Sequence, residues 1–160
     1  MFNPTVFKIN RMSFGNQFTA HTQLKLSPFF ERTSKLNESQ EWRRWSGYLA
    51  ATNYELTHEN EYFAIRTKAA LLDITPLYKY IIEGPDALRF LDRLVTRNIK
   101  ICKVGQVMYT PWCDENGKQI DDGTVQRLTD QKFRITSAEP NLEWIETNAI
   151  GMDLTITDDS

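Results

Sequence analysis

The segment Gly105–Leu128 limits the fold more than any other part of the chain. Alternating apolar and polar residues flank Asp114–Gly117, whose composition is typical of a tight turn. One strand contains Val107 and Tyr109, and the return strand is expected from Gln119 to Leu128. The segment therefore predicts an antiparallel β-hairpin.

The return strand is interrupted by Asp121, Asp122 and Gly123. Successive side chains of a strand point to opposite faces, so the two carboxylates cannot share one side of the sheet. We expect one to meet solvent and the other a specific partner. An acid next to glycine suits a cationic or amine-bearing ligand, because backbone can approach closely there. Paired acids near a strand end also serve turns or stay solvated, and the pattern alone leaves both readings open.

Tyr109 and Asp122, placed on either side of the turn, resemble the hairpin of the glycine cleavage T-protein (aminomethyltransferase) family. That family includes folate-dependent demethylases. A second likeness lies in Ala64–Thr75, which is similar to the family's Arg-x-x-Ala-Gly-hydrophobic-Asp-Val-Ser segment. The resemblance covers roughly residues 27–158, the N-terminal part of a family member.

The resemblance implies a tetrahydrofolate site along this hairpin. It makes Asp122 the catalytic residue, beside the folate nitrogen that accepts the carbon. It also implies cofactor contacts from Tyr109, Leu77 and Ser137, together with Asp122. The implied activity is transfer of a methyl or aminomethyl group from a small-molecule donor to tetrahydrofolate.

Three positions depart from the family pattern. Pro76-Leu77 stands where the family has His-Met, Gln126 replaces a Tyr, and Ser137 replaces an Asn. The last two changes alter the donor side of the pocket, so the donor need not be an aminomethyl-lipoyl protein. A methylated amine, a sulfonium compound and a methoxy-aromatic compound all remain open.

Composition excludes several classes of protein. The chain of 160 residues has 41% apolar residues and a net charge of -2, which suits one ordinary core and gives no electrostatic footprint for nucleic acid. No apolar run is long enough to span a membrane, and Lys8, Asn10 and Arg11 interrupt any signal peptide. We expect a cytoplasmic protein. Two cysteines and two histidines without ligand spacing predict no metal site.

Three helical segments are expected in the first half of the chain, the first of them a short helix with Ser27 as N-cap and Pro28 at its first position. A spacing of three could place these aromatic residues on one helical face, as core or as a stacking platform: Trp42, Trp45 and Tyr48. Thr57 is a candidate N-cap for a helix through Ala70 with an apolar stripe. Arg66 and Asp73 could then pair at the helix end.

The second half alternates strands and helices. Tyr78–Glu83 reads as a strand, Ala87 begins an apolar helical stripe, and Phe133–Ser137 is a strand after the hairpin. A helix follows Pro140, carrying Ile145 and Ile150 on its apolar face, and residues 151–157 form a last strand. The order β-α-β-β-β-α-β predicts an α+β fold, an antiparallel sheet with packed helices.

We expect residues 1–26 to be an arm, partly disordered, and residues 27–160 to be a partial folate-binding domain truncated at its C-terminus. The chain would then be an N-terminal fragment of a longer reading frame, inactive alone. Two alternatives stay open. One is a non-catalytic folate-binding module, and the other is a domain that assembles with a partner chain or as a homo-oligomer.

Overall fold

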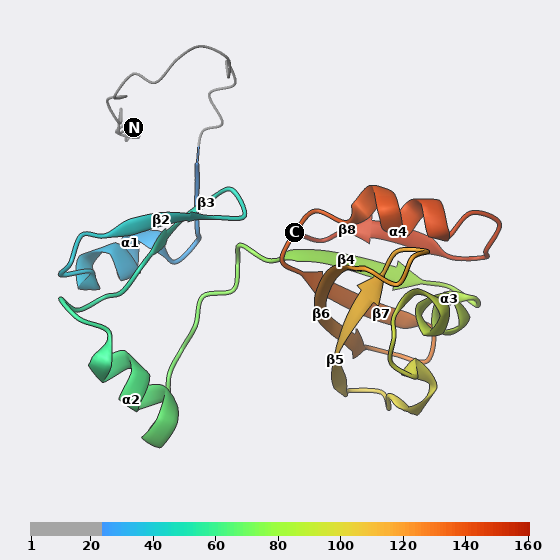
Figure 1. Ribbon diagram of the computed structural model, residues 1–160, viewed down its shortest axis with the longest axis horizontal. Helices are drawn as coiled ribbons and strands as arrows, with labels where there is room; N and C mark the ends of the chain where they lie inside the picture. Colours follow the sequence, from blue (N-terminus) through green and yellow to red (C-terminus); the bar gives the residue numbers. More distant parts are fainter. Residues whose placement is uncertain (1–23) are drawn as a thin grey trace, which may run out of the picture.

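The computed structural model describes residues 24–160 and places them in two parts (Figure 1). The first part is a small sheet with two helices, ending near residue 67. An extended segment leads from there to the second part, a larger sheet with two further helices. This second part, residues 78–160, contains every member of the main apolar core.

The larger sheet has five strands in the order β5-β6-β7-β4-β8, and every neighbouring pair is antiparallel. Its strands are β4 (Tyr78–Glu83), β5 (Val107–Cys113), β6 (Gln119–Arg127), β7 (Lys132–Ser137) and β8 (Thr155–Asp158). Helix α3 (Ala87–Leu94) and the 3-10 turn η2 (Ile99–Ile101) follow β4, and α4 (Leu142–Asn148) precedes β8. The predicted α+β order is confirmed.

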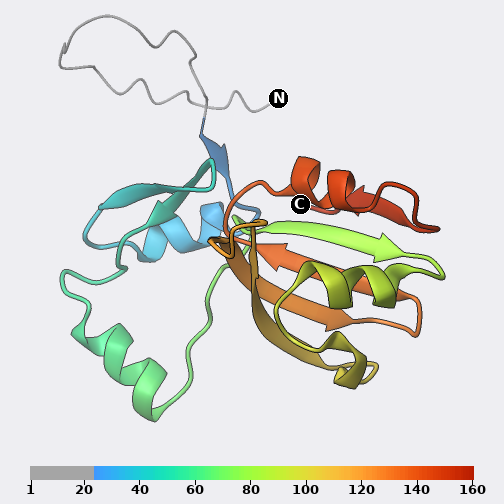
Figure 2. The same ribbon diagram turned by 45° about the vertical axis from the view of Figure 1, so that its right-hand side comes forward.

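One face of this sheet carries the core. In β4, Tyr80 and Ile82 are buried, and the intervening Ile81 is only half-buried. Helices α3 and α4 pack on the sheet (Figure 2), and they contribute Phe90, Leu91 and Ile145 to the core. Burying each such side chain stabilises the fold by about 1.5–3 kcal/mol. The two helices therefore cover this face of the sheet and leave the opposite face available for a ligand.

We call the other side of the sheet the open face. Side chains that alternate with the core residues belong to it, and all are half-buried or exposed. Its members used below are Lys79 on β4, Tyr109 on β5, Asp122 and Thr124 on β6, and Arg134 on β7. Register aligns Lys79, Thr136, Thr124 and Tyr109 in one row across four strands.

The smaller sheet joins β1 (Lys25–Leu26), β3 (Tyr48–Ala51) and β2 (Trp42–Trp45). Helix α1 (Phe30–Thr33) and the 3-10 turn η1 (Ser34–Leu36) precede β2. The predicted helical face of Trp42, Trp45 and Tyr48 is therefore wrong. Ser46 and Gly47 have φ angles of 45° and 82°, and this two-residue turn makes the segment a hairpin.

Helix α2 (Glu59–Thr67) is shorter than predicted, begins after His58 rather than Thr57, and leaves its apolar residues exposed. Tyr62 and Ile65 are 53% and 69% exposed, so their stripe adds nothing to the main apolar core. Asp73 accepts hydrogen bonds from Ser27 and from the Thr75 amide, and no ion pair joins it to Arg66.

Some predicted ends of elements also shift. Helix α4 stops at Asn148, so Ile150 lies outside it and is 80% exposed instead of contributing to the core. Strand β8 starts at Thr155 rather than Gly151. Most of the predicted arm, residues 1–23, lies outside the described residues, while Lys25–Leu26 within its range forms β1. Within residues 24–160, no helix is both long and apolar enough to cross a membrane.

Candidate functional site

The predicted hairpin is confirmed, and it separates the two aspartates as expected. β5 and β6 pair around a turn in which Asp114 Oδ1 accepts from the amides of Asn116 and Lys118. Asp121 is 8% exposed and faces the core side, whereas Asp122 is half-buried on the open face. The two carboxylates therefore have different environments and can serve different purposes.

Asp122 is held by two side chains. The Tyr109 hydroxyl donates to Asp122 Oδ2 at 2.6 Å, and Gln119 Nε2 donates to Oδ1 at 3.1 Å. An ionised carboxylate offers roughly four lone-pair positions, so about two acceptor positions stay free for a ligand. The pair presents an oriented acceptor on the open face.

Tyr109 contributes both a hydrogen bond and a surface. Its hydrogen bond to Asp122 raises the pKa of the Tyr109 phenol, because the neighbouring carboxylate opposes a second negative charge. The hydroxyl thus stays protonated and donating at neutral pH. The side chain is 57% exposed, which leaves the ring accessible for stacking.

Leu77 lies at the other end of the row of strands. It closes a turn in which its amide donates to the Ile74 carbonyl at 3.1 Å, just before β4. Strand β7 lies between β4 and β6, and β7 and β6 lie between β4 and β5, so at about 4.8 Å per strand Leu77 is roughly 10 Å from the strand of Asp122 and roughly 14 Å from that of Tyr109. Among residues 24–160, no hydrogen bond joins Leu77 to either side chain. The predicted pterin contact from Leu77 stays a prediction.

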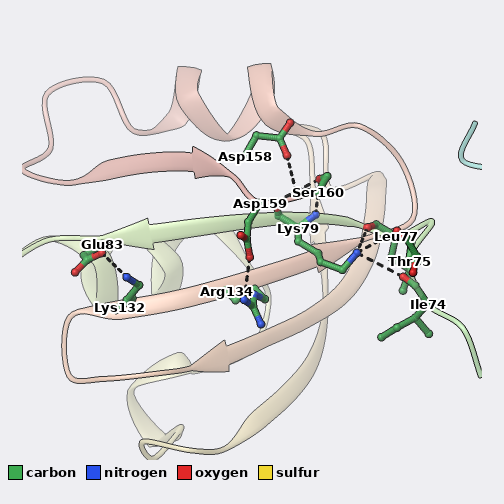
Figure 3. A network of polar contacts seen from close by, with 10 residues as sticks. All are labelled: Ile74, Thr75, Leu77, Lys79, Glu83, Lys132, Arg134, Asp158, Asp159 and Ser160. Carbon is green, nitrogen blue, oxygen red and sulfur yellow. Dashed lines mark hydrogen bonds and ion pairs between the residues drawn. The ribbon is translucent and has the colours of Figure 1, made fainter. Parts of the chain in front are cut away.

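Lys79 fixes the turn that carries Leu77 (Figure 3). Its Nζ donates to the carbonyls of Thr75 at 3.2 Å and Leu77 at 2.5 Å. Burial lowers the pKa of Lys79, and the nearby Arg134 guanidinium lowers it further. Arg134 in turn pairs with Asp159 at 2.8 Å, which ties β7 to the end of β8.

Ser137 is placed apart from the other predicted contacts. It is 1% exposed on the core side of β7, and its hydroxyl donates to the Glu139 carbonyl at 2.9 Å. Its side chain and that of Asp122 lie on opposite sides of the sheet. The structure does not bring Ser137 to the Tyr109–Asp122 pair, and its predicted cofactor contact stays a prediction.

Sequence reasoning missed Gln119 and Lys79. Gln119 reaches Asp122 because the β5–β6 register shifts between Trp112 and Cys113, and no turn residue or spacing announces such a bulge. Lys79 alternates with buried residues and so reads as a solvated side chain. Its contacts with the preceding turn become visible only in three dimensions.

Neither cysteine forms a disulfide, and Cys102 is buried. Over the part of the chain that the structure describes, no group of three or more His, Cys, Asp or Glu side chains is arranged to hold a metal ion. Beside the cationic side chains of Lys79 and Arg134, the open face thus presents the carboxylate of Asp122, the phenol of Tyr109 and the amide of Gln119.

Comparisons with known proteins agree with this architecture. The model of the GCVT N-terminal domain family matches residues 28–160. Trimethylamine-oxide aldolase of Ruegeria pomeroyi is 41% identical over 97 residues, which are 60% of this chain and 12% of that protein. Aminomethyltransferase of Halothermothrix orenii is 32% identical over 131 residues, which are 79% of this chain and 36% of that protein.

A solved structure has a similar fold. The glycine cleavage system aminomethyltransferase T from Bartonella henselae superposes with a TM-score of 0.74 at 24% identity, covering 84% of this chain and 38% of that one. At this identity the likeness shows the fold alone. The chain spans little more than a third of these two aminomethyltransferases.

Proposed function

Because the chain belongs to the glycine cleavage T-protein family through its GCVT N-terminal domain, we propose that the protein transfers a one-carbon group from a small-molecule donor to tetrahydrofolate. The observation that carries this proposal is the Tyr109–Asp122 contact of 2.6 Å on the open face. The family relationship supplies the reaction class, and this contact supplies the group that would serve it.

The residues on the open face fit a reduced pterin. A pterin is a flat heterocycle with several N–H donors, and Asp122 keeps acceptor positions free after binding Tyr109 and Gln119. The exposed ring of Tyr109 offers a flat apolar surface beside that carboxylate. The two side chains together suit a planar ligand that donates hydrogen bonds along one edge.

When bound, tetrahydrofolate supplies a secondary amine that accepts the one-carbon group. Asp122 would accept a hydrogen bond from that amine N–H at a free lone pair and take its proton as the nitrogen bonds to carbon and the donor's own bond to that carbon breaks; the proton would then pass to the released donor. Tyr109 would keep Asp122 Oδ2 oriented throughout, because its raised pKa leaves the phenol protonated. Gln119 would fix the rotation of the same carboxylate from its other oxygen.

We further propose a small methylated amine as the donor class. The relative with 41% identity over 97 residues is named for trimethylamine oxide. Gln126 lies four residues after Asp122 on β6, so the two side chains point to the same side of the sheet. The half-buried amide of Gln126 therefore lies on the open face. The neutral amide of Gln126 can form hydrogen bonds with a polar amine that supplies the methyl group.

The test is calorimetric titration of the chain with tetrahydrofolate kept reduced, for the wild type and for Asp122→Asn. We expect saturable binding that the substitution weakens at least tenfold. Asp153→Asn is the matched control, since Asp153 is exposed and its carboxylate makes no hydrogen bond or ion pair among the described residues. Equal affinity for all three would contradict a role for Asp122 and favour a non-catalytic folate-binding module.

A further inference from the structure

The buried aspartate of the pair has contacts that nothing so far explains. Asp121 Oδ2 accepts from Asn141 Nδ2 at 2.7 Å and from the Glu139 amide at 3.0 Å. Its Oδ1 accepts from the Asp122 amide at 2.8 Å. A carboxylate only 8% exposed is costly to bury, and three N–H donors offset that cost.

The backbone at Asp122 has little other support from the sheet. Its partner in β5 is Pro111, which has no N–H to donate, and the Pro111 carbonyl accepts instead from the Thr96 amide at 3.1 Å. The pairing of β6 with β7 begins only one residue after Asp122, at Gly123 and Ser137. Asp122 therefore lies opposite a residue without an N–H and just outside the β6–β7 pairing.

The segment that holds Asp121 is itself anchored. The Asn141 amide donates to the Tyr80 hydroxyl at 3.0 Å, and Asn141 is 5% exposed. The Asn141 side chain also donates to the Glu139 carbonyl, which closes the segment on itself. Asp121 thus connects a fixed point on the core side to the backbone of Asp122.

We propose that Asp121 is a positioning residue, which fixes Asp122 on the open face by joining its backbone amide to Asn141 and Glu139. This inference rests on the proposed function only for its consequence, the placement of a reacting carboxylate. The geometric part concerns the Tyr109–Asp122 contact and can be tested without any folate.

The experiment measures the pKa of the Tyr109 phenol by NMR of ring-labelled tyrosine, because that pKa reports on the distance to Asp122. Asp122→Asn sets the full effect. We expect Asp121→Ala and Asn141→Ala each to lower the Tyr109 pKa by at least half of that effect. Asn141→Ala is decisive because it changes no charge, so a fall in the pKa there reports a moved carboxylate.

Denaturant unfolding of each variant shows whether it folds. If Asp121→Ala does not fold, Asn141→Ala still tests the proposal. The paired exchange of Asp121→Asn with Asn141→Asp reverses the direction of one hydrogen bond and is expected to restore the Tyr109 pKa. A Tyr109 pKa that changes in Asp121→Ala but not in a folded Asn141→Ala would overturn the proposal, since only the charge would matter.

Tetrahydrofolate titration of the same variants separates this inference from the proposed function. If a variant binds tetrahydrofolate more weakly than the wild type and its Tyr109 pKa is lowered, both the positioning role and the proposed function are supported. A lowered pKa without any tetrahydrofolate binding by the wild type supports the positioning role and contradicts the proposed function.

Discussion

At the scale of single residues, the proposed folate site depends on the phenol–carboxylate contact between Tyr109 and Asp122. Asp122→Asn removes the charge that opposes ionisation, so the pKa of Tyr109 should fall toward its ordinary value of 10.0. Because the folded-state pKa is the higher one, the contact stabilises the fold fully below pH 10 and stops doing so as pH rises through the folded pKa. Difference absorbance of tyrosinate between wild type and variant measures this shift. An unchanged titration would show that the contact is absent in solution.

Tyr80→Phe tests the buried polar cluster beside Asp121. The change leaves the Asn141 amide without its acceptor in a site where Tyr80 is 1% exposed. We expect the free energy of unfolding to fall by about 1–3 kcal/mol, as for other buried donors that lose a partner. Urea denaturation measures it, with Tyr62→Phe, at an exposed position, as a control that should change little. Equal effects of the two changes would contradict the cluster.

Single residues were predicted with mixed success from the sequence. The opposite orientation of Asp121 and Asp122 follows from strand geometry alone and is confirmed. Ser137 shares the two-residue period of Phe133 and Ile135, so strand alternation alone places it on the core side; its predicted cofactor contact came from the resemblance and not from this pattern. Gln119 was missed because a bulge brings it to Asp122.

At the scale of elements, β6 and β7 approach closely at Gly123. A Cβ on Gly123 would lie 1.8 Å from the Thr136 carbonyl oxygen, and backbone there cannot move without breaking the ladder. We expect Gly123→Ala to lower the free energy of unfolding by about 3 kcal/mol, the upper end for overpacking. Thr124→Ala, on the open face of the same strand, should cost less than about 1 kcal/mol. Denaturant unfolding compares them, and equal stability of the two variants would contradict the described β6–β7 contact.

Elements with a two-residue period were predictable, and short ones were not. Tyr78–Glu83 was assigned to its full length, and in the structure Tyr80 and Ile82 alternate as buried residues along it. The strand Trp42–Trp45 has only four residues, so its aromatic spacing also matched a helical turn. Ser46 at φ 45° decides for the hairpin, and serine is a weak turn signal at that position.

At the scale of the whole molecule, the two parts are only loosely joined. Among the hydrogen bonds of residues 24–160, only that from Ser46 Oγ to the Ala138 carbonyl, 2.8 Å, joins residues 24–67 to residues 78–160. Arg66 and Lys68 are exposed at the end of α2. We therefore expect brief trypsin treatment to cut there first and to leave a resistant product containing residues 78–160. Mass spectrometry identifies the sites, and first cuts within β5–β7 would contradict the description.

The exposed apolar stripe of α2 shows that a local sequence pattern can predict a helix without predicting what packs against it. The sequence predicted a helix with an apolar stripe, and α2 has one, but its burial depends on what packs against it. The family resemblance supplied the reaction class and Asp122, which composition and periodicity alone could not.

The proposed function requires tetrahydrofolate to bind the open face around Tyr109 and Asp122. Its most direct test is a titration of isotope-labelled chain with reduced tetrahydrofolate, followed by amide NMR. We expect the largest shifts at Tyr109, Asp122 and Thr124, and we expect them to disappear in Asp122→Asn. Shifts confined to α3, α4 or the small sheet, or no shifts at all, would contradict it.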